Sequence, residues 1–177
     1  MFIRPLLVFG ALLLTIVGLL LTPHAEAGES RVQAPDWTLE EVGGATVSLH
    51  RDARGVPAVL FFWASWCPPC GAALPAMESL YREFAPRGVR FYALNIWEDG
   101  DALGYFRAHG YRLPLFLTAD LVAEDYGIEG TPGVVVIDRQ MGIQELHVDG
   151  AAPREMAGVV RQYLRAELNR NIVTQQR

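Results

Sequence analysis

The hydrophobic positions of the 177-residue chain fall into blocks whose spacing alternates between strand and helix. An unbroken apolar run over 58–64 is typical of a strand that is covered on both faces of a sheet. From Pro68 the apolar residues recur three or four positions apart, which predicts a helix that ends in the turn at 85–88. Pro75 falls inside this helix and is expected to kink it.

The other blocks continue the alternation and predict an α/β fold with a mixed central sheet flanked by helices. Gly43 and Gly44 separate two short runs, which indicates an N-terminal β-hairpin. The predicted elements are hairpin strands over 37–40 and 46–49, strands over 89–96, 113–117, 134–137 and 143–148, and helices over 101–109, from an Asp120 cap to Gly127, and over 153–168, with residues 169–177 expected to fray.

The first 27 residues form a segment apart. Arg4 precedes an apolar run over 6–21, and Ala25-Glu26-Ala27 is a small-x-small cleavage site. This pattern predicts a signal peptide, with an uncleaved N-terminal membrane anchor as the alternative because the run borders on the length of a membrane span. Either outcome places residues 28–177, a single domain by length, in the periplasm or another extracytoplasmic space.

Charge narrows the possible partners. The chain carries 15 basic residues, 20 acidic residues and a net charge of −5. Removal of residues 1–27 leaves this balance unchanged, because Arg4 and Glu26 cancel. A negative chain without a basic cluster argues against binding to nucleic acid, whose affinity for proteins depends on clustered positive charge. Glu124, Asp125 and Glu129 are interpreted as a solvated face.

Cys67 and Cys70 are the two cysteines of the chain. In an exported protein a lone C-x-x-C is either a redox pair or half of a metal site. Structural zinc needs four ligands, and the four histidines have no ligand spacing around the pair. The pair therefore favours thiol–disulfide chemistry without a cofactor or a resident metal.

The cysteines lie where the buried strand ends and the helix begins. A helix N-terminus stabilises a thiolate, so Cys67 is expected to have a lowered pKa and enough exposure to meet a partner's sulfur. Cys70, one turn deeper, is the expected resolving thiol. Pro68 and Pro69 fit the first helical positions, and they limit the number of backbone donors that can reach the Cys67 sulfur.

A resemblance to a known family rests on three motifs: Phe-Trp-Ala-Ser-Trp-Cys-Pro-Pro-Cys over 62–70, Pro75, and Gly130-Thr131-Pro132 before an apolar run. Together they resemble the TlpA-like branch of the thioredoxin-like superfamily, which includes the ResA-type and CcmG/DsbE-type reductases. The resemblance covers about residues 35–168. It implies a thioredoxin-like fold with a central insertion, Cys67 as nucleophile, Cys70 as resolving cysteine, and a cis Thr131-Pro132 bond packed against the pair.

The same resemblance implies a function. The chain is expected to be a protein-disulfide oxidoreductase that works in the reducing direction on oxidised exported proteins, with apocytochrome c as the first candidate. Electrons would come from a membrane thiol carrier of the DsbD/CcdA type, and the chain is expected to act as a monomer. Two alternatives remain open. One is a peroxiredoxin-like peroxidase, which usually has a T-x-x-C motif, whereas no Thr occurs over 61–70 here. The other is a Cu(I) metallochaperone, which could bind the ion with two thiolates alone.

Two positions depart from the family pattern. Phe61 and Ala73 stand where related proteins carry carboxylates that exchange protons with the deeper thiol. Glu98 aligns with another acidic position of ResA-type members, so it is either a group that helps to deprotonate Cys70, directly or through water, or a solvated loop carboxylate. Trp66, directly before Cys67, is expected to be partly exposed as a docking surface, and Trp97 is a second candidate.

Overall fold

The computed structural model describes residues 31–148 and 152–175 of the chain. The predicted signal or anchor segment, 1–27, lies outside these residues and stays a prediction. Within the described ranges, no helix has both the length and the apolar character that a membrane span requires.

A five-stranded mixed sheet organises the domain, in the order β5-β4-β3-β6-β7. The central strand β3 pairs in parallel with β4 and antiparallel with β6, while β5 and β7 complete the two sides. All six residues of β3 are buried, as the unbroken apolar run predicts. The strands span Ala58–Trp63 (β3), Arg90–Asn95 (β4), Leu115–Phe116 (β5), Gly133–Ile137 (β6) and Ile143–Val148 (β7).

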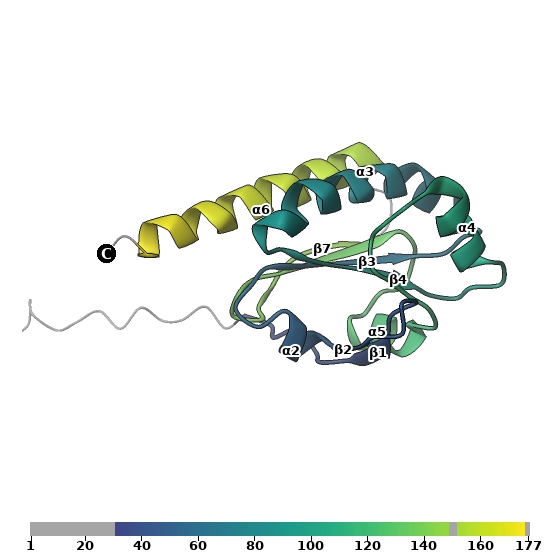
Figure 1. Cartoon of the computed structure of the whole chain (residues 1–177), viewed down its shortest axis with the longest axis horizontal. Coiled ribbons are helices and arrows are strands. Elements are labelled where there is room, and N and C mark those ends of the chain that lie inside the picture. Colours follow the sequence, from purple (N-terminus) through teal and green to yellow (C-terminus); the bar gives the residue numbers. More distant parts are fainter. Residues whose placement is uncertain (1–30, 149–151, 176–177) are drawn as a thin grey trace, which may run out of the picture. The chain divides into compact units, whose positions relative to one another are not determined.

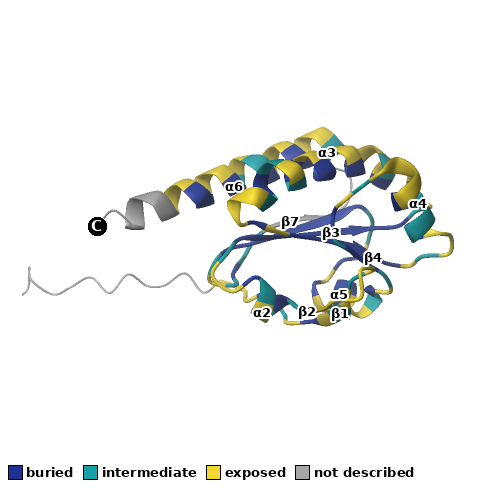
Figure 2. Ribbon diagram, in the orientation of Figure 1, coloured by how far each residue is buried: buried dark blue, intermediate teal, exposed yellow. Residues whose placement is uncertain are grey.

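Helices α3, α4 and α6 cover one face of this sheet, and α2, α5 and the β1–β2 hairpin cover the other (Figure 1). Alternate residues of β3 point to opposite faces of the sheet: Phe61 and Trp63 pack on the face covered by α3, and Phe62 packs on the other face. Figure 2 shows the central strands β3, β4 and β6 as almost wholly buried and the outer helix surfaces as exposed. The elements span Thr38–Glu40 (β1), Thr46–Ser48 (β2), Leu49–Asp52 (α2), Pro68–Phe84 (α3), Ala85–Arg87 (η1), Ala102–His109 (α4), Asp120–Asp125 (α5) and Pro153–Gln175 (α6).

The N-terminal hairpin closes the β5 side of the sheet. Val42 donates its backbone N–H to the carbonyl of Leu115 at 2.9 Å, and Glu41 bridges to Phe116. The hairpin thus covers a two-residue edge strand that would otherwise expose unpaired backbone groups.

Four details differ from the sequence prediction. Helix α2 was not predicted; its His50 N–H is satisfied by the Asp36 carboxylate at 2.9 Å, a partner 14 positions away. Asp120 is the first residue of α5 rather than its cap, which is Ala119. Helix α6 continues to Gln175 instead of fraying from residue 169, and buried Glu167 pairs there with arginines. Strand β5 is shorter than predicted. Helix α3 includes Pro75 in its interior, and the kink expected there stays a prediction.

Three chain segments meet at the carboxyl end of β3. Trp63 pairs with Asn95 at the end of β4, and Phe62 pairs with Gly133 at the beginning of β6. The loop that leads to Cys67 therefore lies beside the loop after β4 and the residues before β6. This end of a sheet is where α/β proteins place their chemistry.

Candidate active site

Cys67 and Cys70 are joined by a disulfide bond at the beginning of α3. Cys67 is the residue that caps the helix, and it is 4% exposed, whereas Cys70 is fully buried. Cys67 is thus the sulfur nearer to solvent, although its exposure in this oxidised state is smaller than we expected. The residues around it, Trp66, Pro68 and Pro69, are exposed, so a partner protein meets them first.

One backbone donor faces the Cys67 sulfur. The N–H of Cys70, the third helical residue, donates to Cys67 Sγ at 3.2 Å. Pro68 and Pro69 occupy the first two helical positions and have no N–H. Gly71 donates instead to the carbonyl of Cys67 at 3.2 Å. In the reduced protein this donor and the helix dipole favour a thiolate at Cys67.

Cys70 lies in an apolar environment. It belongs to the buried cluster beneath α3, which also contains Phe61 and Ala73 at 1% and 0% exposure. The positions that carry carboxylates in related proteins are thus apolar and buried here. Such surroundings disfavour the ionised form of a reduced Cys70 thiol.

The Thr131-Pro132 peptide bond is cis, as the family resemblance implies. Pro132 is buried, Thr131 is half-buried, and Gly133 immediately after them pairs with Phe62 of β3. The register therefore places this bond at the same end of the sheet as the cysteines.

Glu98 joins two of the three loops. Its carboxylate accepts hydrogen bonds from Ser65 N at 2.9 Å and Ser65 Oγ at 2.6 Å, in the loop before Cys67. It also accepts from Asn95 Nδ2 at 2.6 Å and from Gly100 N at 2.9 Å. The alternative of a freely solvated carboxylate is therefore wrong. Glu98 holds the segment between β3 and the active-site cysteine.

These bonds also set the charge of Glu98. Burial opposes its ionisation, but the hydrogen bonds from Ser65, Asn95 and Gly100 outweigh burial and hold the pKa of Glu98 below its ordinary value of 4.5. A saturated carboxylate with a lowered pKa is a weak proton acceptor. The hypothesis that Glu98 helps to deprotonate Cys70 stays a prediction, and the contacts described here support a positioning role.

Trp66 and Trp97 lie next to each other at the surface, with exposures of 48% and 38%. Trp66 Nε1 donates to the carbonyl of Trp97 at 2.7 Å, and Trp97 N donates to Asp120 Oδ1 at 2.8 Å. The φ angle of Trp97 is 50°, in the left-handed region, which costs a bulky residue on the order of 1–3 kcal/mol. The two hydrogen bonds hold this exposed aromatic residue in place.

The supporting roles of Ser65, Asn95 and Asp120 were not predicted from the sequence. Asn95 carried a readable signal, because it is a polar residue, 2% exposed, at the end of an otherwise apolar strand. No signal in the sequence indicated the roles of Ser65 and Asp120, because their hydrogen-bond partners are 33 and 23 positions away.

Metal ligands do not gather in the described part of the chain, where no three His, Cys, Asp or Glu side chains are close enough to hold an ion. The Cu(I) alternative would depend on the two thiolates of the reduced protein and stays a prediction.

Comparison with known proteins places this site in a wider group. The model of the AhpC/TSA family matches residues 31–146. The thioredoxin-like protein YneN of Bacillus subtilis is 32% identical over 128 residues, which are 70% of this chain and 74% of the relative. The thiol-disulfide oxidoreductase ResA of Halalkalibacterium halodurans is 34% identical over 128 residues, with 71% and 70% covered.

Solved structures agree with the fold. A candidate thiol:disulfide interchange protein DsbE of Chlorobium tepidum superposes with a TM-score of 0.69 at 27% identity, covering 78% of this chain and 96% of that one. StoA of Bacillus subtilis, at 19% identity and a TM-score of 0.59, shares the fold over 71% of this chain and 96% of its own.

The positioning role of Glu98 predicts a pH-dependent stability. A carboxylate with a lowered folded-state pKa stabilises the protein above pH 4.5, and this contribution is lost as the pH falls through the folded pKa. Glu98→Gln should lower the free energy of unfolding by about 1–2 kcal/mol at pH 7, and the difference from wild type should shrink below pH 4.5. Urea unfolding across this pH range measures both effects.

Asp99→Asn is the matched control, because exposed Asp99 has no hydrogen bond among the described residues. The positioning role of Glu98 would be contradicted if the difference in unfolding free energy between Glu98→Gln and wild type did not change with pH, or if Asp99→Asn lost as much stability. Titration of Cys70 in reduced Glu98→Gln tests the proton-transfer hypothesis: an unchanged profile rejects it.

Substitution of the two prolines should affect the Cys67 thiol differently. A capping side chain accepts from the second or third helical N–H, so Pro69→Ala adds a donor to Cys67 Sγ, whereas Pro68→Ala adds one that points elsewhere. Pro69→Ala should lower the pKa of the Cys67 thiol by about one unit and, by stabilising the reduced form, raise the reduction potential by about 30 mV. Equilibration with glutathione measures the potential; equal shifts in the two variants would refute the single-donor geometry.

Proposed function

We propose, on the premise that this chain belongs to the AhpC/TSA family and is a thiol-disulfide oxidoreductase of thioredoxin-like fold, that it reduces disulfides of exported proteins through Cys67 and Cys70. The observation that carries the proposal is the bonded pair at the tip of α3, with the Cys70 N–H directed at Cys67 Sγ. This arrangement provides a stabilised thiolate and a second sulfur in contact with it.

The first step is attack by the Cys67 thiolate on one sulfur of a substrate disulfide. A bond forms between Cys67 and that sulfur, the substrate S–S bond breaks, and the other substrate sulfur leaves as a thiolate. The Cys70 N–H that stabilises the attacking charge is already in place before the substrate arrives. Cys67 is the attacking sulfur because it is the one nearer to solvent.

The second step resolves the mixed disulfide. Cys70 loses its proton and attacks Cys67 Sγ, which forms the intramolecular disulfide and releases the second substrate thiolate. Two electrons pass to the substrate, whose two thiolates take up protons from water. Because Cys70 is fully buried among apolar side chains, its deprotonation is the harder of the two proton movements.

An extended substrate can align at the Thr131-Pro132 bond. Backbone groups beside a cis proline at the edge of such a site can pair with a substrate strand. The register of β6 against β3 supports this role, because it brings Thr131 to the end of the sheet that carries Cys67. Trp66, exposed beside Cys67, adds an apolar contact.

The proposed cellular setting rests on the N-terminal sequence pattern. The predicted signal or anchor over 1–27 supports an extracytoplasmic or periplasmic location. In that compartment the reducing direction requires electrons from the cytoplasm, and a membrane thiol carrier of the DsbD/CcdA type is the proposed donor. Apocytochrome c is the first substrate to test.

Trapping tests the proposed function. Without its resolving sulfur, Cys70→Ala should accumulate a mixed disulfide between Cys67 and substrate proteins, stable in non-reducing electrophoresis and released by dithiothreitol. Cys67→Ala is the matched control and should trap nothing. Equal trapping by the two variants would contradict the assigned roles, and no trapping of any exported protein would contradict the function.

A further inference from the structure

Three exposed apolar side chains lie in segments that reach the disulfide end of the sheet. Trp66 and Trp97 are 48% and 38% exposed, and Leu121 is 74% exposed. Hydrogen bonds link their segments: Trp66 Nε1 donates to the Trp97 carbonyl, and Trp97 N donates to the carboxylate of Asp120, the neighbour of Leu121 in sequence. We call Trp66, Trp97 and Leu121 the tryptophan ridge. It begins at the residue directly before Cys67.

The fold keeps this ridge exposed although its backbone is strained. Trp97 has a φ angle of 50°, a conformation that bulky side chains rarely adopt. None of the ridge residues belongs to either buried cluster of the described chain. An exposed aromatic residue held in a strained conformation beside a reactive group points to contact with another molecule.

The chain segments at the disulfide end of the sheet are acidic. The segments 64–75, 96–106 and 118–133, which lead to or from the disulfide end of the sheet, contain no Lys, Arg or His. Their seven acids are Glu98, Asp99, Asp101, Asp120, Glu124, Asp125 and Glu129.

These acids are not all free to bind a partner. Glu98 and Asp120 bind loop groups, and Asp101 caps α4. The other four, Asp99, Glu124, Asp125 and Glu129, are exposed and make no ion pair within the described residues. We call these four carboxylates the acidic border.

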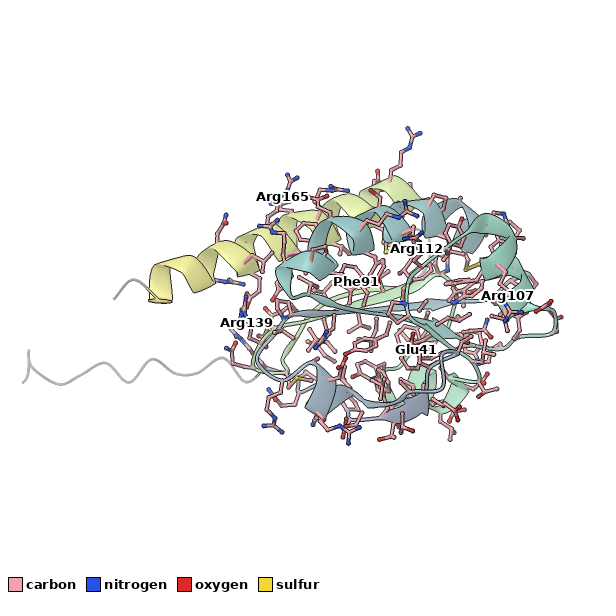
Figure 3. All side chains as sticks on the ribbon, in the orientation of Figure 1. Glu41, Phe91, Arg107, Arg112, Arg139 and Arg165 are labelled. Atoms are coloured by element: carbon pink, nitrogen blue, oxygen red, sulfur yellow. A yellow bond between two sulfur atoms is a disulfide. The ribbon has the colours of Figure 1, made fainter. Side chains whose placement is uncertain are left out.

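The arginines are arranged differently. Arg139 and Arg165 lie toward the opposite end of the sheet from the disulfide (Figure 3). Arg107, on α4, and Arg112 lie in the half of this view that holds the disulfide and reduce the negative charge there. The disulfide end thus faces a partner with exposed aromatic rings and a net negative charge.

We propose that the tryptophan ridge and its acidic border dock a cationic polypeptide segment, with Lys or Arg side chains within a few residues of the disulfide to be reduced. Both parts of the surface recognise the same chemistry. Indole faces attract ammonium and guanidinium groups, and free carboxylates pair with them. This inference rests on the proposed function and specifies its substrate class.

The same charges exclude other occupants. A second copy of this chain would bring its own acidic border against this one, and like charges at an interface oppose association. Nucleic acid and anionic lipid are repelled for the same reason. A positively charged protein segment is therefore the occupant that this surface fits.

Single-turnover reduction of matched peptides tests the inference. Three peptides share one Cys-x-x-Cys disulfide and differ only in flanking residues: three Arg, three Gln or three Glu. Each rate with fully pre-reduced protein is divided by the rate with dithiothreitol, which removes differences in intrinsic disulfide reactivity. The Arg peptide should react about tenfold faster than the Glu peptide at low salt. The ratio should fall toward one at about 1 M salt, where the Debye length is about 3 Å.

Charge variants locate the effect. Asp99→Asn/Glu129→Gln should narrow the Arg-to-Glu rate ratio several-fold. Trp97→Leu should slow the Arg peptide more than the Glu peptide, because leucine has no indole face.

The outcomes separate the two claims. Reduction of all three peptides at equal normalised rates, or an unchanged Arg-to-Glu rate ratio in the Asp99→Asn/Glu129→Gln variant, overturns the cationic docking surface and leaves the oxidoreductase function intact. Failure to reduce any peptide overturns the proposed function itself, and the docking surface with it.

Discussion

The chemistry of this protein depends on one short contact, the hydrogen bond from the Cys70 N–H to the Cys67 sulfur at the tip of α3. Pro68 and Pro69 leave Cys70 as the first helical residue able to donate. The same residue thus supplies the donor that stabilises the reactive sulfur and the thiol that resolves the captured substrate. Cys70 can fill both roles because it is the third helical residue, the position whose N–H faces the capping residue Cys67.

The rest of the domain holds that contact in position. Strand β3 is buried along its whole length and ends four residues before Cys67, so the sheet determines where the helix begins. Glu98 then fixes the connecting loop through Ser65, and the indole of Trp66 binds the backbone of Trp97. A carboxylate that related proteins suggested as a proton carrier here has four donors of its own. Rigidity of the loop is therefore its clearest contribution, and a preorganised loop spares the enzyme reorganisation when the substrate binds.

Much of this architecture could be predicted from the sequence, because its signals are local. The apolar run of β3, the helical spacing after Pro68 and the Thr131-Pro132 motif each identify their element within a few residues. The interactions that could not be predicted are long-range. Asp36 accepts a hydrogen bond from the backbone of α2, Asp120 from the backbone of Trp97, and Glu98 from Ser65. In the sequence each of these carboxylates looks like an ordinary solvated side chain. The low exposure of Cys67 was also unforeseen, since burial of a capping residue depends on loops that meet only in the folded chain.

The most direct test of the account is the pH dependence of alkylation of the reduced wild-type protein, with the two cysteines followed separately by peptide mapping. A helix-tip thiolate at Cys67 should react with a midpoint below the ordinary cysteine value of about 8.5, while buried Cys70 stays unmodified. A Cys67 midpoint at or above about 8.5, or faster alkylation of Cys70, would contradict the assignment of the nucleophile.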